Sequence, residues 1–378
     1  MKASHEQVKP ERYRASFHVP DGAYFLSHSI GCLAATAEQE LQSRGLQPWR
    51  TRGEVWPQWL ESVESFIEAI AELLGVPVHS VCPQANVSSA LAKILYALPE
   101  RRGRKKLLLS EDDFPSLGFV MAQARRAGYE LRYLPGGADL TDLSVWDDAL
   151  TSDVQLALIT HVQSNTGVRL PAERIARLCR EREIVCVLDV AQSAGVIPIN
   201  LGKWPADFAV GSCVKWLCGG PGAGFLYAAD EICGRCEPLD VGWFSHEDPF
   251  EYDIREFRFA PGAKRFWGGT PSIWPYIVAQ AGVRLLLGIG IDEIRRHNQR
   301  LLDFMTAGIE RQTLVSPHDP ERRSGTLVLD FGDNAAAVAH LDNEGIACDR
   351  RRHGVRLSPH VYNRIEEAER IVEVCRLL

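Results

Sequence analysis

The chain has 378 residues, more than one hydrophobic core usually serves, so we expect two domains. Hydrophobic residues make up 46% and charged residues 24% of it, which excludes a disordered or collagen-like chain. The formal charge of -7 argues against nucleic acid as a partner, because binding a phosphate backbone requires a basic surplus.

The first 14 residues are polar, and no apolar run reaches the roughly 20 residues of a membrane-spanning helix. We therefore expect no membrane partner and a cytoplasmic location. The ten cysteines lie mostly in apolar segments, which indicates free thiols. Cys233 and Cys236 have no second cysteine pair and no histidine at zinc spacing, so no metal site is predicted.

Two amphipathic helices are predicted early in the chain. In residues 56–74 apolar side chains recur every three or four positions, and Gly75 follows as a stop signal. The same pattern runs from Val87 to Leu98, directly after Asn86, which is a favourable N-cap.

From residue 106 short apolar runs alternate with helical stretches. The helical stretches are 119–127 and the segment that Pro171 opens. The runs are continuously apolar rather than alternating, which favours a mostly parallel sheet covered by helices on both faces, in an α/β fold. Strands are predicted at residues 107–109, 129–134, 155–159, 184–188, 208–210 and 224–227.

The last third of the chain begins with an aromatic and proline-rich stretch beyond about residue 260. We expect a large domain over residues 15–260 and a smaller domain over residues 261–378, with residues 1–14 added to the smaller one. The smaller domain is predicted to hold helices at 272–288, 292–310 and 365–378 and strands at 326–331 and 354–357.

Polar residues at the ends of predicted strands are candidates for a site, because open parallel sheets bind ligands there. Asp189 ends one apolar run, where a buried carboxylate needs a cationic partner; a helix cap or loop residue is the alternative. Lys215 is the one charged side chain in residues 208–217. Burial would lower its pKa and make the amine nucleophilic toward aldehydes; the alternative is a lysine that extends to the surface.

Asn86, Val87 and Ser88 begin a predicted helix, whose free N–H groups suit a phosphate; a plain capped helix is the alternative. The glycine-rich segment 219–224 fits neither nucleotide-binding fingerprint and is interpreted as a turn. A phosphate cradle, a carboxylate and an isolated lysine together meet the needs of pyridoxal phosphate, which are a phosphate anchor, a protonated ring nitrogen and an aldehyde held as an imine.

With these residues in place, the chain from about residue 24 to 378 resembles the class V branch of the fold-type I pyridoxal-phosphate enzymes. That branch includes kynureninases, isopenicillin N epimerase-like proteins and cysteine desulfurases. The resemblance implies a large domain with a mostly parallel seven-stranded sheet between helices and a smaller α+β C-terminal domain. It rests on Asp113-Phe114-Pro115-Ser116, Asp189-Val190-Ala191-Gln192-Ser193-Ala194-Gly195, Ser212-Cys213-Val214-Lys215, Gly242-Trp243-Phe244, Gly268-Gly269-Thr270-Pro271 and Val355-Arg356-Leu357-Ser358-Pro359-His360.

The resemblance also implies roles for single residues. Lys215 would be the Schiff-base lysine and proton shuttle, Asp189 would hold the pyridinium nitrogen, Gln192 would reach the ring hydroxyl, and Phe114 would stack on the ring. The phosphate would be held by Asn86, Val87, Ser88, Ser212 and Trp243, with Thr270 supplied by the partner subunit of a homodimer whose active site lies at the subunit interface.

For an amino-acid substrate, the resemblance implies that Arg356 clamps the carboxylate as a bidentate partner. A surface arginine at a strand end is the alternative. His28 and Gln163 resemble substrate contacts, and each also has a structural interpretation.

Two departures from the family bear on the reaction. Kynureninases carry tyrosine before the lysine and histidine where Gln192 stands, whereas here Val214 precedes Lys215, which argues against kynurenine hydrolysis. Cysteine desulfurases place a nucleophilic cysteine closer to the arginine than Cys348 is, which argues against a persulfide route.

The sequence therefore predicts a lyase that forms a Cα carbanion from an L-α-amino acid and releases a β-substituent, such as the sulfur of a cysteine derivative. An aminotransferase, or a decarboxylating, deaminating or epimerising enzyme of the same class, is the alternative. A non-catalytic nucleotide-binding α/β module is a third hypothesis.

Overall fold

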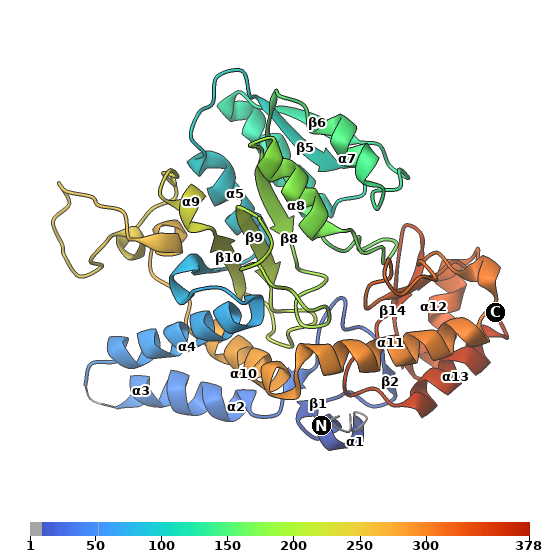
Figure 1. Cartoon of the computed structure of the whole chain (residues 1–378). Coiled ribbons are helices and arrows are strands. Elements are labelled where there is room, and N and C mark those ends of the chain that lie inside the picture. Colours follow the sequence, from blue (N-terminus) through green and yellow to red (C-terminus); the bar gives the residue numbers. More distant parts are fainter. Residues whose placement is uncertain (1–9, 52) are drawn as a thin grey trace, which may run out of the picture.

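The computed structural model describes residues 10–51 and 53–378, so the expectation for residues 1–9 lies outside the described residues. A seven-stranded sheet forms the centre of the molecule, in the order β4-β10-β9-β8-β7-β5-β6 (Figure 1). Neighbouring strands are parallel except at β10, which is antiparallel to β4 and β9. The predicted α/β fold with a mostly parallel sheet is confirmed. The strands are β4 (Val81–Gln84), β5 (Lys106–Ser110), β6 (Glu130–Leu134), β7 (Val154–Thr160), β8 (Val185–Asp189), β9 (Phe208–Ser212) and β10 (Gly224–Ala228).

Helices cover both faces of this sheet, and each face has its own apolar cluster. One cluster includes apolar side chains of α4, α8 and α10, and the other includes those of α5 and α6. Burial of both faces explains why the strands read as continuous apolar runs. The helices of this part are α4 (Trp56–Leu74), α5 (Val87–Ala97), α6 (Pro115–Gln123), α7 (Leu143–Ala149), α8 (Ala172–Glu181), α9 (Asp230–Cys233) and α10 (Trp274–Ile289).

The two predicted N-terminal helices form where the sequence placed them. Gly75 ends α4 in the left-handed conformation, with φ of 66°, which glycine adopts without strain. Further along, α4 packs on α10, and the rings of Phe66 and Tyr276 lie 4.9 Å apart. A helical segment that the sequence did not predict precedes them, formed by α2 (Ala37–Glu40), a π-helix (Leu41–Leu46) and α3 (Gln47–Arg50).

A smaller body follows α10, on the right of Figure 1. Its core joins Ala23 and Phe25 to apolar residues from Leu301 onward. Since α10 packs in the large core, the core clusters divide the chain later than the expected boundary at residue 260, and we propose a division near residue 290. The elements of this part are α11 (Ile291–Gly308), β11 (Leu327–Leu329), α12 (Asn334–Asn343), β12 (Ile346–Ala347), β13 (Asp349–Arg351), β14 (Gly354–Leu357) and α13 (Ile365–Cys375).

Segments near the N-terminus connect the two bodies. β2 (Ala23–Tyr24) pairs with β12, whereas β1 (Phe17–His18) pairs with β3 (Leu33–Ala34). α1 (Pro10–Arg14) precedes them, and in the described part of the chain no helix is long and apolar enough to cross a membrane.

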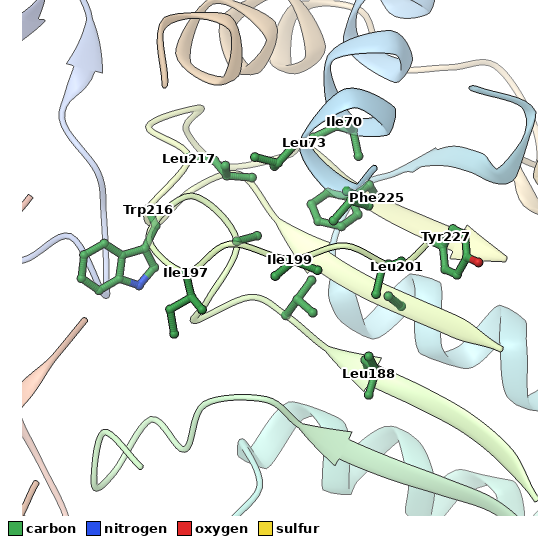
Figure 2. Packing of buried hydrophobic residues seen from close by; sticks show 14 of the residues in the cluster. Ile70, Leu73, Leu188, Ile197, Ile199, Leu201, Trp216, Leu217, Phe225 and Tyr227 are labelled. Carbon is green, nitrogen blue, oxygen red and sulfur yellow. The ribbon is translucent and has the colours of Figure 1, made fainter. Parts of the chain in front are cut away.

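The turn that carries Lys215 is fixed by burial on both sides. Trp216 and Leu217, the next two residues, are fully buried in the large core, as Figure 2 shows. On the other side, the Gly31 amide donates to the Val214 carbonyl over 2.9 Å, and a Cβ added at Gly31 would lie 2.1 Å from the Lys215 carbonyl oxygen. The segment around Gly31 therefore lies so close to the lysine turn that only glycine fits at this position.

Candidate active site

A cavity of about 210 Å3 opens at the carboxyl ends of the central strands, where the predicted site residues meet. Asp189 ends β8, and Ser212 ends β9. Lys215 follows β9, and the start of α5 faces the same space. Eight predicted residues line this cavity, namely Asn86, Val87, Ser88, Phe114, Asp189, Gln192, Ser212 and Lys215.

Asp189 and Lys215 carry the charges of this cavity. The Asp189 side chain is buried, and its Oδ1 accepts a hydrogen bond from the Ala191 amide over 2.9 Å. Burial raises the pKa of Asp189 and lowers that of Lys215, although each charge opposes the shift of the other. Within the described chain neither side chain has an ion-pair partner within 4.0 Å, so both charges remain available to a ligand.

Phe114 forms the wall next to the lysine. Its ring centroid lies 5.5 Å from Lys215 Nζ, which is within the range of a cation–π contact. Phe114 is 42% exposed and lines the cavity. A flat ligand bound in the cavity would cover this surface.

The N-terminus of α5 supports both interpretations of its sequence. Asn86 is an N-cap in extended conformation, and its Oδ1 accepts a hydrogen bond from the Ser89 amide over 2.9 Å. The Val87 and Ser88 amides are first-turn donors, which a helix leaves without internal acceptors. The cap is therefore formed, and free donors still line the cavity.

Gln192 is held by two hydrogen bonds within the protein. Its Nε2 donates to the His28 carbonyl over 3.1 Å, and its Oε1 accepts from Trp216 Nε1 over 3.2 Å. These contacts fix which end of the amide faces the His28 segment. One N–H of the amide remains for a ligand in the cavity.

Several buried polar atoms close to the cavity have no well-aligned hydrogen bond. In the described part of the chain, these are Thr160 Oγ1, Asp113 Oδ1 and both polar atoms of the Gln163 side chain. Thr160 lines the cavity, and burial raises the pKa of Asp113 to about 6 against hydrogen bonding from Thr160 and Gln163. These side chains therefore form a polar cluster beside the cavity.

The Arg356 and His28 side chains are held by hydrogen bonds within the protein. Arg356 Nε and Nη2 donate to the two oxygens of Asp349, over 2.8 Å and 2.6 Å. His28 Nε2 also contacts Asp349, over 2.8 Å, and its Nδ1 lies 2.7 Å from the Ser358 hydroxyl. Arg356 is 3% exposed, so the alternative of a surface arginine is wrong.

Trp243 and Thr270 are placed away from the other predicted residues of the same chain. Trp243 Nε1 donates to Thr270 Oγ1 over 3.3 Å, and the Trp243 ring packs against Trp56 with 5.6 Å between the centroids. Neither residue lines the cavity. That Trp243 joins Ser88 at a phosphate stays a prediction, since within one chain the segment after α9 folds onto the aromatic residues of α4.

The family model of class-V aminotransferases matches residues 33–375. The chain belongs to the class-V aminotransferase family. The kynureninase of Deinococcus radiodurans is 33% identical over 302 residues, covering 77% of this chain and 72% of that protein. The uncharacterized aminotransferase YcbU of Bacillus subtilis is 26% identical and covers 96% of both chains.

Two solved structures show the same fold as this class-V chain. The apo cysteine desulfurase from Thermococcus onnurineus NA1 matches with a TM-score of 0.86 and 23% identity, covering 97% of this chain and 98% of that one. The cystine C–S lyase C-DES, in complex with its product cysteine persulfide, matches with a TM-score of 0.84 and 22% identity, covering 94% and 97%.

The class-V chain is a pyridoxal-phosphate-dependent enzyme. The cavity fits this cofactor, because it combines a buried carboxylate and a lysine that have no ion-pair partner among the described residues with an aromatic face and free helix N–H groups.

Two residues near the class-V site were not assigned from the sequence. Thr160 gave a detectable signal, because it ends the apolar run of β7 as Asp189 ends that of β8. Asp349 gave none, because it lies in a charged segment that looks like a solvated surface.

Cys348 lies next to Asp349 in the chain. Burial, and after it the Asp349 charge, raises the pKa of the Cys348 thiol to about 12, so the thiol is protonated and a poor nucleophile.

Proposed function

We propose that this class-V enzyme is a lyase that breaks the Cβ–S bond of a cysteine-derived L-amino acid. When bound, pyridoxal phosphate supplies the electron sink that allows the Cα–H bond of an amino acid to ionise. The remaining steps depend on the chain's own residues.

The cofactor would be held by the residues that line the cavity. Asp189 would accept a hydrogen bond from the ring nitrogen, and the Gln192 amide would reach the ring hydroxyl. Phe114 would stack on the ring, and Lys215 would be the covalent attachment. The phosphate would contact the start of α5, at Asn86, Val87 and Ser88, and the Ser212 hydroxyl.

One observation carries the proposal: among the described lining residues, Lys215 and Asp189 are the only two that are ionisable. Asp189 would be committed to the ring nitrogen, so Lys215 would be the single group that moves protons. Burial lowers its pKa, which favours the neutral amine that takes the Cα proton.

A site with one proton-transfer group suits a leaving group that departs as an anion and needs no general acid to protonate it. Thiolates and persulfides are such leaving groups, because they are stable anions near neutral pH, with thiol pKa values of about 8.5. Hydrolysis of a carbon–carbon bond, as kynureninase relatives would suggest, requires in addition an activated water.

Transamination is the second candidate. The relative YcbU, which carries the name of an uncharacterized aminotransferase and matches along 96% of both chains, favours it. A single lysine that moves a proton away from Cα and returns it elsewhere would serve this reaction as well.

Product analysis separates the two reactions. The holoenzyme is incubated with cystine and S-alkyl cysteines, and pyruvate and free thiol are measured. Repeated release of both, abolished by Lys215→Ala and retained in the exposed-lysine control Lys203→Ala, supports the lyase. A single equivalent of keto acid with conversion of the cofactor to its amine form would instead establish an aminotransferase.

We also propose that the enzyme is a cytoplasmic homodimer in which Trp243 and Thr270 complete the partner's phosphate site. The hydrogen bond from Trp243 to Thr270 would place both residues together at the partner's phosphate site. Beside them, Tyr252 and Ile254 are 77% and 99% exposed, an apolar surface that a second copy would cover. Light scattering of the purified enzyme tests this; a monomer with full activity would refute it.

A further inference from the structure

We propose that Asp349 is the positioning residue that orients Arg356 toward the substrate carboxylate, an inference that rests on the proposed amino-acid chemistry. Asp349 in β13 and Arg356 in β14 are directly opposed in the antiparallel register. Their side chains therefore leave the sheet on the same face. The ion pair is fixed by strand pairing as well as by its two hydrogen bonds, over 2.8 Å and 2.6 Å.

The geometry leaves one useful edge of the guanidinium free. Arginine has five N–H groups in a planar fork. Asp349 takes the edge formed by Nε and Nη2, and Nη1 donates to the Ser164 carbonyl over 3.2 Å. One N–H of Nη1 and one of Nη2 remain, which is the pair that grips a carboxylate in bidentate fashion. The Nη1 contact joins Arg356 to Ser164, a residue that lines the cavity.

His28 supports Asp349 from the opposite side. Burial lowers the pKa of His28 to about 4, against the hydrogen bond to Asp349, so the ring is neutral near pH 7. A carboxylate only accepts, so His28 Nε2–H donates to Asp349 and Nδ1 accepts from the Ser358 hydroxyl. Ser358 in turn bonds Thr326 over 2.8 Å. His28 is thus a support for Asp349 rather than a substrate contact.

The unit of Arg356, Asp349 and His28 has no net charge before substrate binds, because Asp349 balances Arg356 and His28 is neutral. Arg351 Nη1 lies 3.5 Å from Asp349 and adds a partly exposed positive charge. One substrate carboxylate is accepted by directional hydrogen bonds.

The test compares two small ligands that differ by one carboxylate. Binding of L-alanine and of ethylamine to the holoenzyme is measured by calorimetry and by the change in cofactor absorbance. Asp349→Asn should weaken alanine binding by about tenfold or more, the usual effect of losing a charge-assisted bidentate contact, and leave ethylamine binding unchanged. Asp303→Asn is the matched control, because it breaks the contact of another buried arginine, Arg323, in the same part of the chain.

Three results would overturn the inference. Equal or tighter alanine binding by folded Asp349→Asn would make Asp349 a competitor for Arg356 rather than its support. Equal weakening of alanine and ethylamine would show a general structural effect. If the parent enzyme and Arg356→Ala discriminate equally between alanine and ethylamine, Arg356 does not bind the carboxylate.

A second pair of variants keeps the test decisive if Asp349→Asn does not fold. His28→Ala removes the support of Asp349, and His28→Gln supplies an amide donor in its place. Alanine binding should weaken in His28→Ala and recover in His28→Gln. If alanine binding is unchanged in both variants, the inference is refuted. Because binding is measured without turnover, failure to release thiol would count against the proposed lyase alone.

Discussion

Replacing Asp113 by asparagine should stabilise the enzyme near neutral pH. Asp113 Oδ2 accepts a hydrogen bond from the Ser110 amide over 2.8 Å, whereas Oδ1 is enclosed and has no well-aligned partner among the described residues, with Thr160 and Gln163 as weaker donors. Burial raises the pKa of Asp113 from 3.8 to about 6. The folded state thus holds this proton to a higher pH than the unfolded chain does, and the ionised carboxylate is a destabilising charge.

The magnitude follows from the shift of about two pKa units. At about 1.4 kcal/mol per unit, the charge destabilises the folded state by about 3 kcal/mol above pH 7, as an upper bound because the side chain keeps some contact with solvent. Between about pH 4 and pH 6 the unfolded chain has lost the proton and the folded state has not, so stability falls as pH rises. Asp113→Asn removes this dependence.

Thermal unfolding of the holoenzyme at two pH values is the assay. Asp113→Asn should raise the melting temperature by up to about 4 °C near pH 7.5 and by about half as much near pH 5. Asp153 is the control of opposite sign, because the hydrogen bond from Lys106, followed by that from Thr151, lowers its pKa to about 2. Asp153→Asn should destabilise near neutrality. No gain from Asp113→Asn, or a gain that is the same at both pH values, would refute the reasoning.

Three further substitutions test other parts of the site. Asn86→Ala removes the cap of α5 and should lower stability by about 1 kcal/mol and weaken cofactor binding, as followed by dialysis; unchanged stability would contradict the cap. Gly31→Ala would force a Cβ against the Lys215 carbonyl and should lower kcat at least tenfold, whereas Gly118→Ala, in open space, should not; equal rates would show that the lysine turn tolerates displacement. Cys348→Ser should keep kcat within about twofold, and complete loss of thiol release would restore a persulfide route.

The large sheet and its site were predictable because local and global signals agree there. A run of apolar residues that ends in one polar side chain is the mark of a buried strand, and Asp189 and Lys215 stand out for that reason. The start of α5 was predictable from Asn86, whose capping preference is local. Sites built from strand ends and caps can therefore be found in a single sequence.

Contacts that depend on tertiary register could not be predicted. Asp349 looks like one more charge in an arginine-rich segment, and its partner is set only when β13 pairs with β14. Trp243 matches a family motif, but the motif does not say whether the residue serves its own chain or a partner. The core that α10 joins could not be predicted for a similar reason, because its apolar face fits either core in the sequence and packs on α4 in the fold.

The most direct test of the account identifies the lysine that binds the cofactor. The holoenzyme is reduced with borohydride, digested, and analysed by mass spectrometry for a pyridoxyl group. The account predicts a single modified residue, Lys215, whose amine faces the cavity with a pKa lowered by burial. Lys93 is the internal control, because it is also buried but donates to the carbonyls of Phe266 and Trp267. Modification of Lys93 or of any lysine other than Lys215 would contradict the assignment of this site.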